Sequence, residues 1–126
     1  MKIDLIQLEV LKSRLSKEHT IEIKIISDSM QPLLKIDETV TVIPFEKKCE
    51  IFDLIVFWRN DKLFCHYMWR DQISFNNSVI TRSLKEPYSD EKPVERIHIL
   101  GTIKDKKIRL ATKLLILAKN VIKRST

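Results

Sequence analysis

The sequence predicts a single mainly β domain, a twisted antiparallel sheet or half-open barrel with short helices at its ends. Three observations lead to this prediction. The chain has 126 residues, the length of one domain with one modest core. Short β-rich runs fill its middle, and helical periodicity is confined to its two ends. No repeat or linker divides it, so we predict a helix over residues 1–19, a β core over 20–108 and a basic amphipathic helix over 109–126.

The first half of the chain contains one helical pattern and four strand patterns. Residues 3–18 place apolar side chains at helical spacing, which predicts a short amphipathic helix. TIEIKIIS (20–27) alternates isoleucine with charged residues, as a half-buried strand does. TVTVIP (39–44), DLIVFWR (53–59) and KLFCHYMWR (62–70) predict three further strands. Asn60-Asp61 predicts a tight hairpin turn between the last two.

The second half ends the sheet and returns to helical spacing. Asn76-Asn77 predicts a turn between DQISF (71–75) and SVITRS (78–83). RIHILGTIKDKKI (96–108) predicts the last strand, bent or bulged at Gly101. Residues 109–123 then carry an apolar arc with lysine and arginine largely opposite, which predicts the terminal helix.

Composition excludes several classes of protein. The net charge is +6, but residues 104–124 alone hold eight Lys or Arg against one Asp, so we expect no specific nucleic-acid partner. The two cysteines, Cys49 and Cys65, are too few for a disulfide scaffold or a zinc site, and we expect no metal or cofactor. The chain shows no signal-peptide pattern and no run that could span a bilayer. We therefore expect it to be cytoplasmic or peripheral to the membrane.

The stretch SDSMQP (27–32) raises the question of serine chemistry. A serine hydroxyl is a weak nucleophile that needs a neighbouring base and donors for the oxyanion that forms on attack. Taken alone, this stretch predicts only a polar turn. The motifs that follow it change the interpretation.

These motifs, taken in their order along the chain, make the sequence resemble the type I signal peptidase superfamily, whose fold is shared with the self-cleaving repressors of the SOS response. The family's first motif reads approximately S/G-x-S-M-x-P-x-L followed by G-D-x-V-x-V, and its second reads G-D-I-V-V-F. The resemblance covers roughly residues 23–103. The positions that fit the first motif are Ser27, Ser29, Met30, Pro32, Leu34, Asp37, Val40 and Val42, and those that fit the second are Asp53, Ile55, Val56 and Phe57.

The resemblance implies a serine peptidase site. Ser29 falls on the nucleophile, and the Ser27 hydroxyl with the Ser29 backbone N–H falls on the oxyanion hole. Met30 and Pro32 would shape the loop that presents Ser29 and meet the substrate. His66, in FCHYMWR, falls on the base position of the histidine branch of the family. A neutral imidazole is a competent base near pH 7, although a half-buried histidine without a role is the alternative.

A third residue would orient the histidine. The family carries this carboxylate in a segment that corresponds to TRSLKEPYSDEKPV (81–94). Asp90 is the candidate that the resemblance implies, Glu91 is the second choice, and a plain loop role for Asp90 stays open.

The sequence departs from the family pattern at several positions. Asp28 stands where a small residue is usual, and its carboxylate would oppose an oxyanion if it pointed inward. Ile36 and Phe52 replace the glycines of the two G-D pairs, so we expect altered turns there, because glycine adopts positive φ most readily. Leu84 replaces a family aspartate, and Tyr67 replaces an arginine.

Three functions remain in competition. The first is a serine endopeptidase that cleaves a leader or secreted peptide, and the second is a catalytically impaired relative that binds peptides or partners. The third is a self-cleaving repressor-type regulator, which normally needs a DNA-binding domain and a lysine base. The segment before Thr20 is too short for that domain, and His66 occupies the base position.

The terminal helix leaves two interpretations open. Its basic face and apolar arc suit peripheral contact with an anionic membrane. Packing of the arc on the sheet or against a second copy is the alternative.

Overall fold

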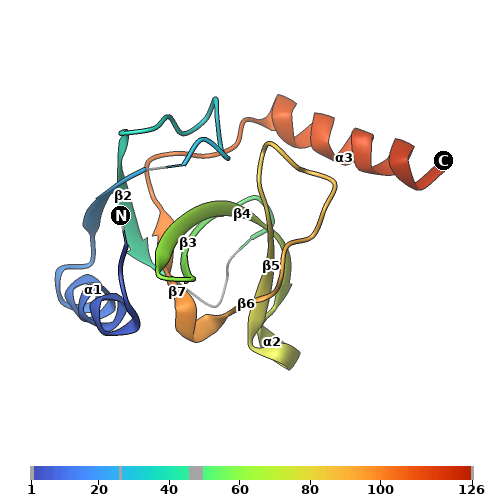
Figure 1. Cartoon of the computed structure of the whole chain (residues 1–126). Coiled ribbons are helices and arrows are strands. Elements are labelled where there is room, and N and C mark those ends of the chain that lie inside the picture. Colours follow the sequence, from blue (N-terminus) through green and yellow to red (C-terminus); the bar gives the residue numbers. More distant parts are fainter. Residues whose placement is uncertain (1, 26, 46–49, 126) are drawn as a thin grey trace.

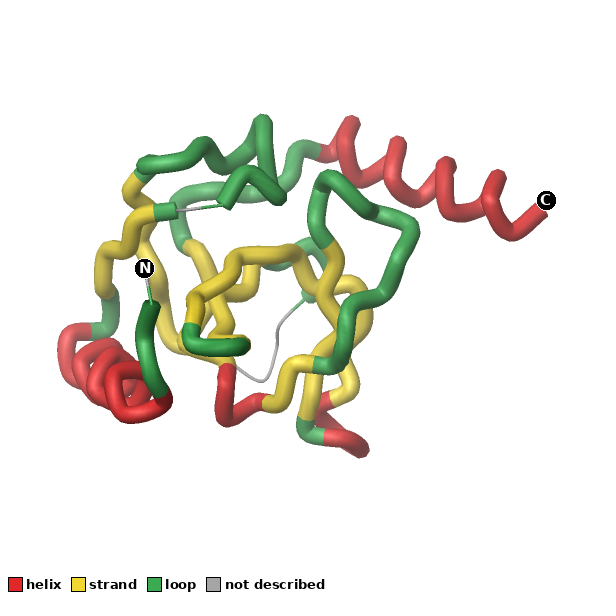
Figure 2. The backbone as a smooth tube through the Cα atoms, in the orientation of Figure 1, coloured by secondary structure: helices red, strands yellow, loops and turns green. Residues whose placement is uncertain are grey.

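The computed structural model describes residues 2–25, 27–45 and 50–125. It shows a seven-stranded antiparallel sheet in the order β1-β2-β7-β3-β4-β5-β6, which curls without closing (Figures 1 and 2). The mainly β fold predicted from the sequence is therefore confirmed. The strands are β1 Ile21–Lys24, β2 Thr39–Pro44, β3 Leu54–Arg59, β4 Lys62–Gln72, β5 Ser78–Arg82, β6 Val94–Glu95 and β7 Ile99–Ile103. The helices are α1 Leu5–Glu18, α2 Ile73–Asn76 and α3 Leu110–Ser125, with a 3-10 turn η1 at Arg96–His98.

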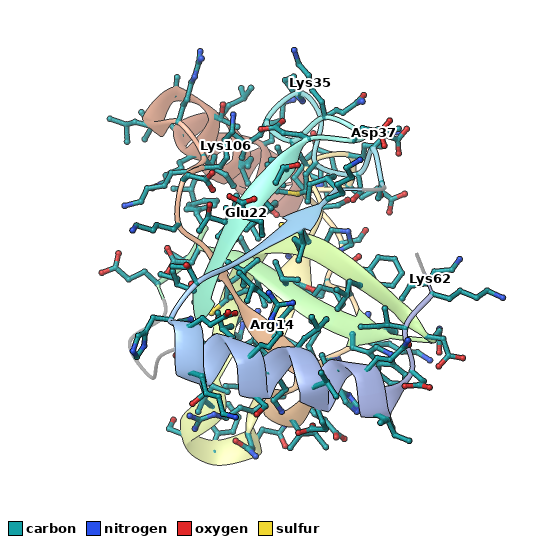
Figure 3. The ribbon with its side chains drawn as sticks, turned by 90° about the vertical axis from the view of Figure 1, so that its left-hand side faces the viewer. Arg14, Glu22, Lys35, Asp37, Lys62 and Lys106 are labelled. Carbon is teal, nitrogen blue, oxygen red and sulfur yellow. The ribbon has the colours of Figure 1, made fainter. Side chains whose placement is uncertain are left out.

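Helix α1 confirms the predicted N-terminal helix, and its start is capped by side chains. Asp4 Oδ1 accepts a hydrogen bond from the Gln7 backbone N–H at 2.8 Å, and Gln7 Oε1 accepts one from the Asp4 N–H at 2.8 Å. This reciprocal arrangement satisfies two N–H groups that the helix itself cannot. Leu8 and Leu15 are buried as α1 crosses the sheet beside β1 and β2 (Figure 3).

The β3–β4 hairpin has the predicted two-residue turn. Asn60 and Asp61 have φ of 51° and 61°, the left-handed pair that a type I′ turn requires. Asn and Asp tolerate this conformation better than other non-glycine residues. The turn therefore sets the register of β4 against β3, with His66 opposite Ile55.

Gly101 lies where three strands come closest. It pairs with Pro44 of β2 and with Val56 of β3, and the register of β3 and β7 shifts immediately beyond Val56. An ideal Cβ at this position would lie 2.1 Å from the Ile43 carbonyl oxygen, so only a hydrogen atom fits. The predicted irregularity at Gly101 is confirmed.

The second half of the sheet differs from the prediction in two places. β4 continues to Gln72, but Ile73–Asn76 forms the single turn α2 rather than a strand, and Asp71 Oδ1 accepts a hydrogen bond from the Ile73 N–H at 2.9 Å. The last predicted strand is shorter, since η1 precedes β7. β6, only two residues long, pairs with β5 and has no signal in the sequence.

Apolar side chains pack on both faces of the sheet. One cluster joins α1 to the sheet and to the loop between β1 and β2 and includes Leu8, Met30, Leu34, Val42 and Tyr67. The other is built from Ile55, Phe57, Met68, Val79, Val94 and Ile99. Because side chains alternate along a strand, β4 places Tyr67 in the first cluster and Met68 in the second, and His66 lies on the same face as Met68.

Candidate active site

His66 is held at the centre of the sheet by β4. Its side chain is buried, with 7% of its surface exposed. The ring lies edge-on to Phe57 at a centroid distance of 5.6 Å and tilted against Phe64 at 6.0 Å. Aromatic packing of this kind fixes the orientation of the imidazole before any hydrogen bond is considered.

Ser29 lies in the loop between β1 and β2, and buried neighbours anchor this loop. Met30 and Leu34 have 1% and 0% of their surface exposed, and the Leu34 N–H donates to the Met30 carbonyl at 3.0 Å. The peptide bond between Gln31 and Pro32 is cis, and Pro32 is exposed. The buried side chains of Met30 and Leu34 therefore hold the loop in place, and the Ser29 hydroxyl points toward His66 of β4.

The structure brings Ser29 and His66 together, although 37 positions separate them. Ser29 Oγ lies 3.0 Å from His66 Nε2, the distance of a hydrogen bond. Ser27 Oγ lies 3.1 Å from Ser29 Oγ, and it accepts a hydrogen bond from the Ser29 N–H at 3.2 Å. The two groups predicted to form an oxyanion hole are therefore adjacent to the hydroxyl that would attack.

The carboxylate at His66 is Glu91, and the prediction of Asp90 in this place is wrong. Glu91 Oε1 lies 2.7 Å from His66 Nδ1 and also accepts a hydrogen bond from Thr81 Oγ1 at 2.7 Å. Asp90 points elsewhere: its Oδ1 pairs with Arg82 at 2.6 Å and 2.8 Å. The Glu91 N–H also donates to the Thr81 carbonyl at 3.1 Å, and this backbone bond determines which of the two acids faces the histidine.

Hydrogen bonds keep Glu91 ionised. Burial alone would raise its pKa, but the hydrogen bond from His66, the charge of that residue and the hydrogen bond from Thr81 outweigh burial and lower the pKa below its ordinary value. An ionised carboxylate at Nδ1 selects the tautomer that carries its proton there. His66 Nε2 is then free to accept the proton of Ser29.

No protein-family model, curated protein or solved structure matches the chain. The family resemblance therefore rests on the sequence motifs alone and stays a prediction.

Asp28 does not oppose the proposed oxyanion. Its carboxylate pairs with Lys85 Nζ at 2.5 Å, and this hydrogen bond with the charge of Lys85 lowers the pKa of Asp28. The Lys85 backbone N–H also donates to the Ser29 carbonyl at 3.3 Å. Both contacts join the loop of Ser29 to residues 83–93, which carry Glu91.

The turn before β3 is left-handed even though it lacks the family glycine. Phe52 has φ of 75°, and its ring packs on Tyr67 at 5.6 Å and on Trp69 at 6.1 Å between centroids. In the turn before β2 the left-handed residue is Asp37, with φ of 68°, and not its neighbour Ile36. Packing at Phe52 and the tolerance of aspartate at Asp37 take the place of glycine.

Two recesses adjoin the Ser29 hydroxyl. An apolar recess of about 20 Å³ lies on one side, lined by Ile23, Ile25, Ser29, Met30, Leu34, Val56, Leu63 and Cys65 among others. A wider cleft of about 380 Å³ lies on the other, lined by Ser27, Ser29, Phe64, His66, Ser83, Lys85, Glu86, Ser89, Asp90 and Glu91. Of the two residues predicted to contact substrate, Met30 lines the apolar recess and Pro32 does not.

Cys65 is no rival to Ser29 as a nucleophile. It is a free thiol with 8% of its surface exposed, and burial raises its pKa, which keeps it protonated. Cys49 lies outside the described residues. Among the residues that the structure describes, no group of His, Cys, Asp and Glu could hold a metal ion.

Thr81 and Lys85 are site residues that sequence reasoning missed. Thr81 matched the start of a family segment, but nothing in the pattern indicated that its hydroxyl binds the orienting carboxylate. The only sequence signal for Lys85 was a charge opposite to that of Asp28. The two residues are far apart in the sequence and come together only in the fold.

Proposed function

We propose that the chain is a serine endopeptidase of the signal peptidase type that cleaves a leader or secreted peptide by a Ser-His mechanism. The observation that carries the proposal is the Ser29 Oγ–His66 Nε2 distance of 3.0 Å, continued by Glu91 at 2.7 Å on the other ring nitrogen. A serine, an imidazole and a carboxylate in this sequence of contacts have the roles of a catalytic triad.

In the proposed reaction, Ser29 Oγ attacks the carbonyl carbon of the scissile peptide bond, and His66 Nε2 takes its proton. Glu91 stabilises the imidazolium that forms and keeps the ring oriented. The oxyanion replaces the contact between Ser27 and Ser29 and accepts hydrogen bonds from the Ser27 hydroxyl and the Ser29 N–H. His66 then protonates the leaving amine, which departs and leaves an ester on Ser29 Oγ. Water that gives its proton to His66 attacks this ester, and His66 returns the proton to Ser29 Oγ as the carboxylic acid leaves.

The size of the recess beside Ser29 favours a substrate with a small side chain on the residue before the scissile bond. Its volume of about 20 Å³ accommodates one methyl-sized group, and most of the residues that line it are apolar, with Lys24, Ser27 and Ser29 as the polar ones. The wider cleft on the His66 side leaves room for the chain beyond the scissile bond. An extended peptide with alanine or another small residue at the cut fits this arrangement.

Labelling by a fluorophosphonate tests the proposal without knowledge of the substrate. We expect the wild-type protein to be labelled at Ser29, Ser29→Ala to be unlabelled, and His66→Ala to be labelled at least about a hundredfold more slowly, because the base is lost. Ser74→Ala, an exposed serine on α2, serves as the matched control and should react as wild type does. Unchanged labelling of Ser29→Ala or His66→Ala would reject the mechanism.

A second candidate is a catalytically impaired relative that binds peptides or partners. The contacts that favour it are the Asp28–Lys85 pair and the bond from the Lys85 N–H to the Ser29 carbonyl, which join the two rims of the cleft. This candidate predicts that small-residue peptides bind without cleavage and that Ser29 stays unlabelled. Self-cleavage of the repressor type has weaker support, because the base at Ser29 Oγ is an imidazole and not a lysine.

A further inference from the structure

One face of α3 is fixed against the body of the protein. Ile116 is buried, with 4% of its surface exposed. Asn120 Oδ1 accepts a hydrogen bond from Arg82 Nη1 at 2.8 Å, and its Nδ2 donates to the Pro87 carbonyl at 3.3 Å. The Lys113 ammonium lies 5.7 Å from the centre of the Phe52 ring. These contacts fix the rotation of α3 about its axis.

The opposite face of α3 is apolar and exposed. Four leucines lie there, Leu110, Leu114, Leu115 and Leu117, with 71%, 58%, 55% and 41% of their surface exposed. Ala111 and Ala118 are exposed as well. At 100° per residue these six side chains form one continuous arc, and Figure 1 shows α3 extending away from the sheet. Exposed arcs of this kind mark interaction surfaces.

Charge indicates what this arc would contact. Residues 104–124 carry eight Lys or Arg and one Asp. Lys104, Lys107, Arg109 and Lys119 are exposed. Two copies that joined through this face would bring like charges together, and an acidic surface would be attracted instead. Leucine is a poor ligand for nucleic-acid phosphates, so the partner must accept apolar side chains and basic groups together.

We propose that α3 lies in the interface of an anionic lipid bilayer, with its leucine arc inserted among the acyl chains. Lys119 of the helix and the exposed basic residues just before it, Lys104, Lys107 and Arg109, lie against the headgroups. An apolar arc with basic flanks binds membranes in this way. No described helix is long and apolar enough to cross a bilayer. Because α3 is already fixed by its other face, the leucines need no rearrangement before they insert. This inference does not depend on peptidase activity.

Co-sedimentation of the full chain with vesicles tests the proposal. We expect binding to vesicles of phosphatidylcholine with about 30% phosphatidylserine, weaker binding to phosphatidylcholine alone, and weaker binding at high salt. Leu114→Gln with Leu117→Gln should reduce the partition at least about tenfold. Lys107→Glu with Lys119→Glu should reduce it about 25-fold or more, at about fivefold for each of the two basic groups lost.

Matched controls test whether vesicle binding needs the α3 leucines or only exposed apolar side chains in general. Ile6 on α1 and Phe75 on α2 are each 76% exposed, and Ile6→Gln and Phe75→Gln should bind vesicles as wild type does. Circular dichroism would show that every variant is folded. Binding that survives both double substitutions, or that is equal on neutral and anionic vesicles, would overturn the proposal. Concentration-dependent dimers in the absence of lipid, dissolved by Leu114→Gln with Leu117→Gln, would overturn it in favour of a second copy.

Discussion

At the scale of the residue, Glu91 Oε1 accepts hydrogen bonds from two groups, the His66 ring and the Thr81 hydroxyl, each at 2.7 Å. Thr81 is fully buried, so its hydroxyl has little freedom to turn away. The Thr81 contact therefore positions the carboxylate, and the carboxylate in turn positions the imidazole. Second partners of this kind hold catalytic side chains within the narrow range of productive geometries.

The two neighbouring acids make a direct test of which carboxylate orients His66. We expect Glu91→Gln to slow fluorophosphonate labelling of Ser29 by about a hundredfold to ten-thousandfold, because the amide favours the wrong tautomer. Asp90→Asn should slow the rate by less than about tenfold, because Asp90 binds Arg82 and acts on His66 only through the position of the loop. Equal losses in both variants, or a larger loss in Asp90→Asn, would contradict the assignment.

Acid should weaken the fold in part through Glu91. Burial works to raise the pKa of Glu91, but the hydrogen bonds from His66 and Thr81 and the charge of His66 bring it below its ordinary value of 4.5. A carboxylate with a lowered folded-state pKa contributes stability that is present above pH 4.5 and is lost as the pH falls through the folded-state value. Urea unfolding of wild type and Glu91→Gln should therefore differ most near neutral pH, with the difference shrinking below that value. A difference that stays constant down to about pH 3 would show that folding does not lower the pKa of Glu91.

The choice between Asp90 and Glu91 also shows where sequence reasoning ends at this scale. Ser29, His66 and Ser27 could be placed from motifs, because each occupies a fixed offset within a short segment. The loop of residues 83–93 has no motif that fixes the position of its acid. A shift of one residue exchanges Asp90 for Glu91 as the acid that faces the sheet. Only the backbone bond from Glu91 to Thr81 resolves the choice.

At the scale of the element, the entry to β3 depends on a bulky residue in a left-handed turn. Phe52 has φ of 75°, and its ring lies between Tyr67 and Trp69 of β4 and near Lys113 of α3. The conformation is unfavourable for a residue with a Cβ. Ring packing stabilises it, so one side chain supports the turn, the strand and the helix together.

Glycine and alanine at position 52 separate strain from packing. Both variants lose the ring, which we expect to lower the free energy of unfolding by about 3 kcal/mol. Phe52→Gly should nonetheless be more stable than Phe52→Ala by about 1 kcal/mol, because only alanine keeps a Cβ at positive φ. Chemical unfolding measures both values, and Ile51 provides the control: there alanine should be the more stable of the two, since Ile51 is not left-handed. An alanine variant at position 52 that equals or exceeds the glycine variant would show that the turn is unstrained.

Most elements were predictable because their signals are local. Alternation marked β1, β-rich runs marked β2 to β4, Asn60-Asp61 marked the hairpin, and helical spacing marked α1 and α3. The failures depend on tertiary contacts. DQISF predicts a strand, but its last three residues begin α2, where the Asp71 carboxylate accepts a hydrogen bond from the Ile73 N–H. β6 exists only because β5 supplies its partner.

At the scale of the whole molecule, α3 is coupled to the site through one buried cation. Arg82 has 7% of its surface exposed and binds Asp90, the Pro87 carbonyl and Asn120 Oδ1. Asn120 binds the same Pro87 carbonyl. The C-terminal helix therefore holds the loop of residues 83–93 against β5, and that loop delivers Glu91 to His66. The two ends of this series of contacts, Asn120 and His66, lie far apart in the sequence.

This coupling predicts that a substitution on α3 loosens the site without unfolding the sheet. Asn120→Ala removes one bond to the Pro87 carbonyl of the loop and one to Arg82 of β5. We expect faster hydrogen exchange over residues 84–91 with little change over β3 and β4. Labelling of Ser29 should slow by about threefold to tenfold, since the carboxylate is less often in place. Lys119→Ala should leave both measurements unchanged, because this neighbouring side chain is exposed. Uniformly faster exchange across the sheet would instead mean that Asn120 supports global stability, and unchanged exchange in the loop would mean that residues 83–93 hold Glu91 in place without α3.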